Sequence, residues 1–289
     1  MAHRAGPVID AHHHLWTIRV GSHPWLEGRA LHRSFGASDY DRTFAGQEIA
    51  ATVWIEALAA DPMAELAEAE AVRQATDGRI GAALIAHVPL DAPDVEERLD
   101  ACARVSPAFR GVRDILSPRV ARAPDLLERP GFLAGLRALA RRGLVFEAML
   151  TPPQMRAAAA LLAQVPDLAV ALEHVGSPHD RSATGLALWQ EGLDAFAALP
   201  GSIVKLSAMQ CLEPGWTDAS LGAILAPVAE RFGAGRICVG TDWPVHDETC
   251  PGPEALDTLR RLTADWDAQD RRAVFATTAQ RFYGIGCGT

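Results

Sequence analysis

Short apolar runs alternate with longer alanine- and leucine-rich runs along the whole chain, and this alternation most restricts its fold. Eight of the apolar runs read as strands: 8–12, 52–57, 80–88, 109–116, 144–150, 169–175, 202–207 and 236–243. They begin about every 30 residues, which is the spacing of strand–helix units in an eightfold barrel. The pattern therefore predicts an α/β fold of the (β/α)8 TIM-barrel type.

The intervening runs have helical periodicity, and glycine or proline marks where each helix gives way to the next strand. The clearest helices are expected at 63–75, 132–142, 153–165 and 221–232. The chain of 289 residues suits one barrel, and no linker or composition break divides it. We expect a single domain over residues 1–289.

Charge and cysteine content limit the partners and the compartment. A net charge of −9 without a long basic run argues against a nucleic-acid partner. No apolar run is long enough to cross a membrane, and no signal segment is evident. The five cysteines lack metal-binding spacing, so we expect reduced thiols and a cytoplasmic location. The expected partner is a small molecule. Whether the chain forms a homo-oligomer stays open.

The segment V-I-D-A-H-H-H-L-W, residues 8–16, places three histidines at the end of the first expected strand. Side chains alternate in a strand, so His12 and His14 should share one face and His13 the other. At the carboxyl end of a barrel strand, His12 and His14 would point into the mouth, where they could meet one metal ion or one substrate oxygen. The alternative is a pair of surface histidines, and His13 is expected to pack.

Two further strand ends carry residues suited to chemistry. His174 ends the sixth strand and Asp242 ends the eighth, so both should reach the same mouth as His12 and His14. Asp242 is a candidate general base for water. The alternatives are a structural histidine and an aspartate that caps a turn.

Other polar residues near the mouth are candidates for substrate contacts. Arg113 could hold a carbonyl or carboxylate through its planar guanidinium. Glu56, Trp243 and Lys205, the last being the only lysine in the chain, are further substrate-binding candidates. For Arg113, Lys205 and the strand glutamates Glu147 and Glu173, a structural ion pair is an equal alternative.

The ordered set of motifs resembles the amidohydrolase superfamily, which is built on a distorted version of this barrel. The segments that carry the resemblance are I-D-A-H-H-H-L-W, H-P-W-L, F-R-G-V-R, L-E-H-V-G-S-P, V-K-L-S, G-T-D-W-P-V and A-Q-R-F-Y. Together they look like its sugar-lactone hydrolase branch, which includes L-fuconolactonase- and L-rhamnonolactonase-like proteins and has pyrone-dicarboxylate lactonase as a relative. The resemblance spans the whole chain.

This resemblance implies roles for the residues that match the motifs. His12, His14 and His174 resemble metal-site or carbonyl-polarising histidines, Asp242 the residue that activates water, and Arg113 a substrate-binding arginine. One divalent ion, zinc or manganese, held by His12, His14, His174 and Asp242 is expected, with metal-free catalysis as the alternative. The fourth strand has no lysine to form a carbamate bridge, so a carbamate-bridged metal pair is not expected.

Departures from the branch pattern leave the substrate open. The branch often has histidine where this chain has Asp114, glutamine near Glu56, and aspartate where this chain has Glu173. The roles of Asp114 and Glu147 are not predicted.

We therefore expect a lactonase of carbohydrate catabolism that opens an aldonic acid lactone with water activated by Asp242, His174 and Arg113 assisting. The first alternative is a metal-dependent decarboxylase of an aromatic or unsaturated acid. The second is a barrel that binds a sugar acid without catalysis.

Overall fold

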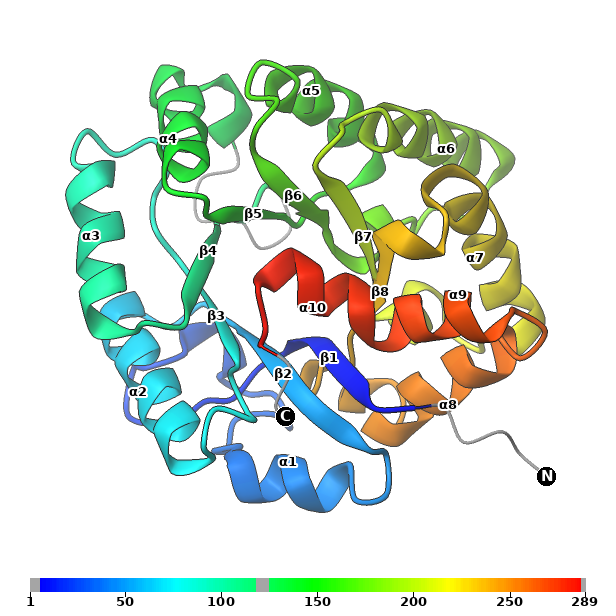
Figure 1. Ribbon diagram of the computed structural model, residues 1–289, viewed down its shortest axis with the longest axis horizontal. Coiled ribbons are helices and arrows are strands. Elements are labelled where there is room, and N and C mark those ends of the chain that lie inside the picture. Colours follow the sequence, from blue (N-terminus) through cyan, green and yellow to red (C-terminus); the bar gives the residue numbers. More distant parts are fainter. Residues whose placement is uncertain (1–5, 118–124, 287–289) are drawn as a thin grey trace.

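The computed structural model describes residues 6–117 and 125–286, and its strands form one parallel sheet that follows the order of the chain (Figure 1). The strands are β1 (Val8–His13), β2 (Ile49–Ile55), β3 (Ala83–Ala86), β4 (Phe109–Arg113), β5 (Val145–Ala148), β6 (Ala169–Leu172), β7 (Ser202–Leu206) and β8 (Ile237–Val239). The predicted TIM barrel is confirmed. Several strands are shorter than predicted, because their last residues turn out of the sheet toward the mouth.

Two backbone hydrogen bonds close the sheet between its first strand and the segment after its last. The amide of Asp242 donates to the carbonyl of His12 at 2.7 Å, and the amide of His14 donates to the carbonyl of Trp243 at 2.7 Å. The barrel is thus nearly closed, with β1 joined to the segment after β8 at the carboxyl-terminal end.

Helices surround the barrel and separate successive strands (Figure 1). They are α1 (Ala37–Thr43), α2 (Pro62–Ala75), α3 (Val95–Val105), α4 (Pro130–Arg141), α5 (Pro152–Leu162), α6 (Ala183–Ala197), α7 (Asp218–Phe232), α8 (Gly252–Leu262), α9 (Ala268–Arg272) and α10 (Thr278–Tyr283). The helices predicted at 63–75, 132–142, 153–165 and 221–232 are α2, α4, α5 and α7. Local chemistry sets their starts: the Asp61 carboxylate accepts hydrogen bonds from the amides of Met63 and Ala64, both at 3.0 Å.

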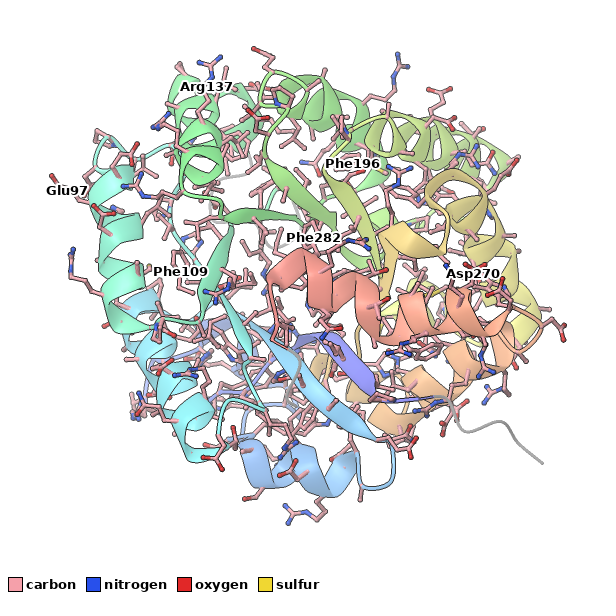
Figure 2. The ribbon with its side chains drawn as sticks, viewed as in Figure 1. Glu97, Phe109, Arg137, Phe196, Asp270 and Phe282 are labelled. Atoms are coloured by element: carbon pink, nitrogen blue, oxygen red, sulfur yellow. The ribbon has the colours of Figure 1, made fainter. Side chains whose placement is uncertain are left out.

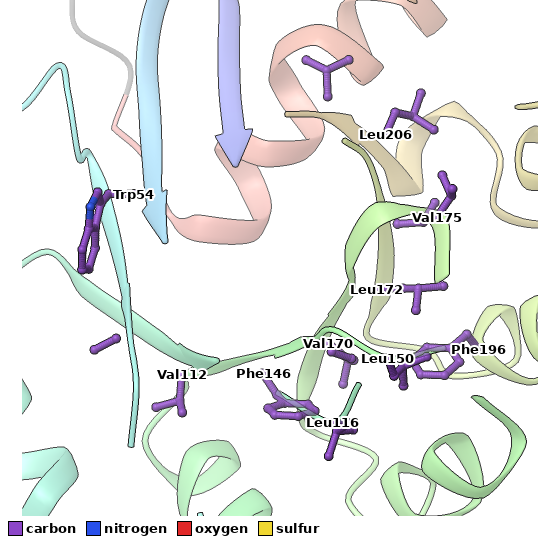
Figure 3. Packing of buried hydrophobic residues seen from close by; sticks show 14 of the residues in the cluster. Trp54, Val112, Leu116, Phe146, Leu150, Val170, Leu172, Val175, Phe196 and Leu206 are labelled. Carbon is purple, nitrogen blue, oxygen red and sulfur yellow. The ribbon is translucent and has the colours of Figure 1, made fainter. Parts of the chain in front are cut away.

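The larger apolar core lies between the strands and the surrounding helices. Val112, Phe146 and Val170 point from β4, β5 and β6 away from the barrel axis, and Phe196 of α6 packs toward the same layer (Figure 3). All four are almost completely buried. Figure 2 shows charged side chains such as Glu97 and Arg137 on the outer surface.

A second apolar cluster fills the lower part of the barrel interior. Alternate strand residues such as Val53, Ile55 and Ile85 meet Ala279 and Tyr283 of α10 there. Helices α9 and α10, joined by a π-helical turn at Ala273–Thr277, run across this end of the barrel (Figure 1). Among the described residues, α10 therefore plugs the amino-terminal ends of the strands, so the mouth is expected at their carboxyl-terminal ends.

No helix among the described residues is both long enough and apolar enough to span a membrane. Cys102, Cys211, Cys238 and Cys250 are free thiols, as predicted, and Cys287 lies outside the described residues.

The fully buried side chain of Asp10 links the segments that close the barrel. Its carboxylate accepts hydrogen bonds from the amide and hydroxyl of Thr241, at 2.9 and 2.7 Å, from the Tyr40 hydroxyl at 2.7 Å and from the His12 amide at 3.1 Å. Burial raises the pKa of Asp10, although these four hydrogen bonds oppose the rise. One carboxylate thus ties β1, α1 and the segment after β8.

Replacing Asp10 should destabilise the fold strongly. Asp10→Ala leaves buried donors unpaired and should lower the free energy of unfolding by about 3–5 kcal/mol, whereas Tyr40→Phe removes one hydrogen bond and should cost about 1–2 kcal/mol. Urea unfolding followed by tryptophan fluorescence measures both. Equal costs would mean that the closure is anchored elsewhere.

Candidate active site

A cavity of about 280 Å³ opens at the carboxyl-terminal end of the barrel. Its lining consists of His14, Trp25, Arg29, Ala57, Leu58, Arg113, Ile115, Met149, His174, Ser177, His179, Ala208, Cys211, Leu212, Asp242 and Val245. The two long connections, after the first and eighth strands, contribute Trp25, Arg29 and Val245 to this lining.

A bulge near the end of β1 sets the direction of the histidines. The pairing of β1 with β2 shifts register between Asp10 and His13, so that Ala11 belongs to the interior cluster and His12 also faces the interior. His12 lies against Gly240, where an added Cβ would come within 2.6 Å of the His12 Cβ. Glycine at this position leaves room for the imidazole of His12.

His13 points away from the cavity, as the alternation predicted. Its Nε2 lies 2.7 Å from the Thr52 hydroxyl, and its ring packs at 4.9 Å from the ring of Tyr40. Burial lowers the pKa of His13 to about 3, so the imidazole is neutral in the folded protein.

His14 and Asp242 line the base of the cavity, and His12 meets them from just behind the lining. The Nε2 atoms of both histidines lie 3.4 Å from the same oxygen of Asp242, Oδ1. The other nitrogen of His14, Nδ1, lies 2.9 Å from the carbonyl oxygen of Ile55, which directs its Nε2 toward Asp242. Neither nitrogen of His12 has a hydrogen-bond partner.

His174 joins this group from a short turn, Glu173–Gly176, that follows β6. Its ring centroid lies 4.7 Å from that of His12, and its Nδ1 lies 2.8 Å from the Ser207 hydroxyl. The turn has left-handed backbone at His174, with φ of 51°.

Left-handed backbone is concentrated at this cavity. Of the eight described non-glycine residues with positive φ, five line it, and they are Leu58, His174, Ser177, Ala208 and Asp242. Such conformations cost of order 1–3 kcal/mol each and persist where the surrounding structure enforces them. They let a chain leaving a strand turn back over the mouth and aim its side chain inward.

The protonation states in the cluster favour a cation. Burial raises the pKa of Asp242, but His174 and His14 together lower it by a larger amount. The pKa of Asp242 therefore lies below its ordinary value. Burial, reinforced by Lys205, holds the pKa of His12 well below the ordinary value, and burial also lowers the pKa of His174. An ionised carboxylate beside the neutral imidazoles of His12 and His174 is the form in which these groups bind metal.

The geometry also fits a metal ion. Ligand atoms around one tetrahedral zinc ion stand about 3.4 Å apart, which is the observed separation of Asp242 Oδ1 from each histidine Nε2. His12, His14 and Asp242 form one group whose ligand atoms lie within 4.8 Å of one another, and His12, Glu173 and His174 form a second. The four predicted ligands are thus drawn together, with Glu173 beside them as a further possible ligand that was not predicted in that role.

Arg113 lies at the edge of the cavity, but its donors are engaged inside the protein. It donates to a carboxylate oxygen of Glu56 at 2.8 Å and to the Glu56 carbonyl, and its Nη1 lies 3.4 Å from Glu173 Oε2. These ion pairs, together with burial that opposes them, leave the pKa of Arg113 above its ordinary value. The structural ion pair considered for Arg113 is present, alongside its place in the lining.

Three predicted substrate contacts lie outside the cavity lining. Glu56 is held by Arg113, and Lys205 is buried against Glu147 with 2.7 Å between Nζ and Oε2. Trp243 packs against the rings of Phe35, Tyr40 and Phe44. Their contact with substrate stays a prediction that this geometry does not favour.

Some supporting residues escaped the sequence analysis. Tyr283, from α10, donates to Glu147 at 2.6 Å, and Ser207 lies at hydrogen-bond distance from His174. The V-K-L-S and R-F-Y motifs contain both residues, but a motif does not say which distant side chain each will meet.

The chain is similar to known proteins over most of its length. A family model described as "Amidohydrolase" matches residues 9–285. An L-fucono-1,5-lactonase from Burkholderia multivorans is 27% identical over 296 residues, covering 96% of each chain. Another from Burkholderia ambifaria is 28% identical over 246 residues, covering 82% of this chain and 80% of that one.

Solved structures share the fold. An amidohydrolase from Burkholderia multivorans with bound HEPES superposes with a TM-score of 0.87 at 25% identity, covering 97% of this chain and 100% of that one. A crystal form of the amidohydrolase with bound zinc also has a TM-score of 0.87, at 24% identity and the same coverage. A putative 2-pyrone-4,6-dicarboxylic acid hydrolase from Pseudomonas putida, 22% identical with a TM-score of 0.75, covers 96% of this chain and 98% of that one and shows likeness of fold alone.

The buried neutral state of His13 predicts a pH dependence of stability. Its pKa is lower in the folded protein, about 3, than in an unfolded chain, so only the unfolded chain takes up a proton as pH falls below about 6.5. The free energy of unfolding should therefore drop by about 1.4 kcal/mol per pH unit from this group alone. His13→Gln should remove that part of the slope between pH 6.5 and 5, measured by urea unfolding with chelator present. Parallel pH profiles would contradict it.

Proposed function

We propose that this chain, which belongs to the amidohydrolase family, is a hydrolase that opens a lactone. The carrying observation is Asp242, an ionised carboxylate at the mouth of the barrel with two imidazole nitrogens 3.4 Å from one of its oxygens. Relatives named as lactonases over most of this chain support the reaction class.

In this proposal, Asp242 moves the proton that hydrolysis requires. Its left-handed backbone and the hydrogen bond from its amide to the carbonyl of His12 fix the carboxylate at the base of the cavity. The carboxylate accepts a proton from water as the water oxygen bonds to the lactone carbonyl carbon. The bond from that carbon to the ring oxygen then breaks, and Asp242 returns the proton to the departing ring oxygen. The products are the carboxyl and hydroxyl groups of one open-chain acid.

A single divalent ion, zinc or manganese, belongs to this proposal. His12, His14 and Asp242 would hold it, with His174 completing the predicted set. When bound, such an ion polarises a carbonyl oxygen and lowers the pKa of water. The zinc-bound crystal form of the Burkholderia multivorans amidohydrolase supports a metal here.

The substrate proposed first is an aldonic acid lactone. The names of the two Burkholderia relatives support that class, and a cavity of about 280 Å³ suits a single ring with small substituents. Beyond the reacting groups, the described lining offers Arg29, Ser177 and His179 for polar contacts. Leu58, Ile115 and Met149 provide apolar wall, which suits ring carbons without hydroxyl groups.

Asp242→Asn should lower kcat for lactone hydrolysis by about 10²–10⁴-fold, because the amide cannot accept the proton from water. A pH-indicator assay over a panel of aldonolactones measures it. Asp247→Asn is the matched control, since Asp247 is a nearby carboxylate outside the cavity lining, and it should keep activity within about threefold.

Near-normal turnover by Asp242→Asn would contradict the mechanism. Release of carbon dioxide from a dihydroxybenzoate without turnover of any lactone would replace the proposal with a decarboxylase. Tight binding of a sugar acid with no turnover would replace it with a binding protein.

Removing metal should abolish turnover. Chelation followed by gel filtration should reduce the hydrolysis rate to background, and one equivalent of zinc or manganese should restore it, with metal content measured in parallel. Full activity in verified metal-free protein would mean that the histidines and Arg113 stabilise the oxyanion themselves.

A further inference from the structure

Glu173 is a fully buried carboxylate that the proposed reaction does not use. Its Oε1 lies 3.6 Å from Nδ1 of His12 and has no hydrogen-bond partner. Its Oε2 lies 3.4 Å from Arg113 Nη1 and 3.8 Å from His174 Nε2. Burying a carboxylate oxygen without a hydrogen-bond donor destabilises the fold, so a residue that does so is a candidate for a functional role.

His12 connects this carboxylate to the reacting group. One ring nitrogen, Nε2, lies 3.4 Å from Asp242, and the other, Nδ1, faces Glu173. Histidines that bind metal almost always donate their second N–H to a carboxylate, carbonyl or water, which fixes the tautomer and the ring orientation.

We propose that Glu173 is the positioning residue for His12. It accepts the Nδ1–H of His12, so that the lone pair of Nε2 faces His14 and Asp242. The separation of 3.6 Å exceeds an ordinary N–H···O bond by about 0.6 Å, and hydrogen bonds of this kind tighten when a site is loaded. This inference rests on the metal site within the proposed function.

Arg113 completes the arrangement from behind Glu173. It is itself held by Glu56, with 2.8 Å between Nε and Oε1, and the three side chains are at most 5% exposed. The chain of contacts Glu56, Arg113, Glu173 and His12 therefore fixes the last member through charges that cannot swing into solvent. Arg113 acts on the site through Glu173 as well as from its own place in the cavity lining.

The competing role for Glu173 is direct ligation of a second ion with His12 and His174. The fixed guanidinium of Arg113, 3.4 Å from Glu173 Oε2, argues against it. A second dication at this carboxylate would stand close to a permanent positive charge in a poorly screened interior.

Zinc affinity tests the assignment without any substrate. Competition with a chromophoric chelator should give one zinc equivalent for the wild-type protein and for Glu173→Gln, with affinity about 10–100-fold weaker in the variant. Cobalt substitution should show a changed visible spectrum in Glu173→Gln, because the ligand field at His12 changes. Since no lactone is needed, failure of the lactonase proposal would not imitate failure here.

Glu147→Gln is the matched control. Glu147 is equally buried on the neighbouring strand β5 but pairs with Lys205 and Tyr283 rather than with a ligand histidine. Its zinc affinity should stay within about threefold of wild type. If Glu173→Gln does not fold, Arg113→Lys, which keeps the charge but loses the planar fork, should weaken zinc binding by several-fold.

Three results would overturn the proposal. One is zinc affinity of folded Glu173→Gln within threefold of wild type. Another is two zinc equivalents in wild type and one in Glu173→Gln, which would make Glu173 a ligand. The third is a wild-type protein that binds no divalent ion.

Discussion

The closure of the barrel between β1 and the segment after β8 is the constraint on which the site depends. His12 and Asp242 share a backbone hydrogen bond across this closure, as do His14 and Trp243. The residues that meet in the cavity are therefore neighbours by backbone pairing before their side chains interact. Asp10 reinforces this closure by accepting four hydrogen bonds. The contacts that close the barrel therefore also position the side chains of the candidate site.

Buried charge inside the barrel is stabilised by pairing in two separate groups. Arg113 lies between Glu56 and Glu173 near the mouth, whereas Lys205 lies against Glu147 deeper in the interior. Burial raises the pKa of Glu147 to about 7, against the lowering effect of Lys205. Buried pairs of this kind contribute little net stability, but removing one partner is costly. These ion pairs hold the polar side chains of the barrel interior in one arrangement, next to the apolar cluster at the amino-terminal ends of the strands.

Periodicity was enough to predict the barrel, because eight repeats of strand and helix admit few alternatives, whereas the family resemblance came from the motifs at the strand ends. Periodicity also predicted the opposite faces of His13 and its two neighbours. The bulge after Asp10 could not be predicted, because strict alternation would place Ala11 and His12 on opposite sides. Glu173 was expected within a strand, but it begins a turn outside the strand, where a period of two no longer applies, so its contact with His12 could not be predicted.

The structure brings the predicted reacting residues together, whereas three of the predicted substrate contacts lie outside the cavity lining. Lys205 and Glu56 found charged partners from strands far away in the sequence, and Trp243 found rings from residues 35–44. Which charges pair inside a barrel depends on strand register and on side-chain length, and neither is visible in a motif.

Within the described part of the chain, helix α10 closes the end of the barrel opposite the cavity. With Ala279 and Tyr283 packed into the amino-terminal end, a small molecule reaches the cavity and leaves it by the same route. In the proposed reaction, ring opening would create a carboxylate within reach of Arg113 and the imidazoles, in the volume that the next neutral ring must enter. The open-chain acid would then compete with the lactone for the cavity, and net turnover would depend on how quickly the acid is removed from solution.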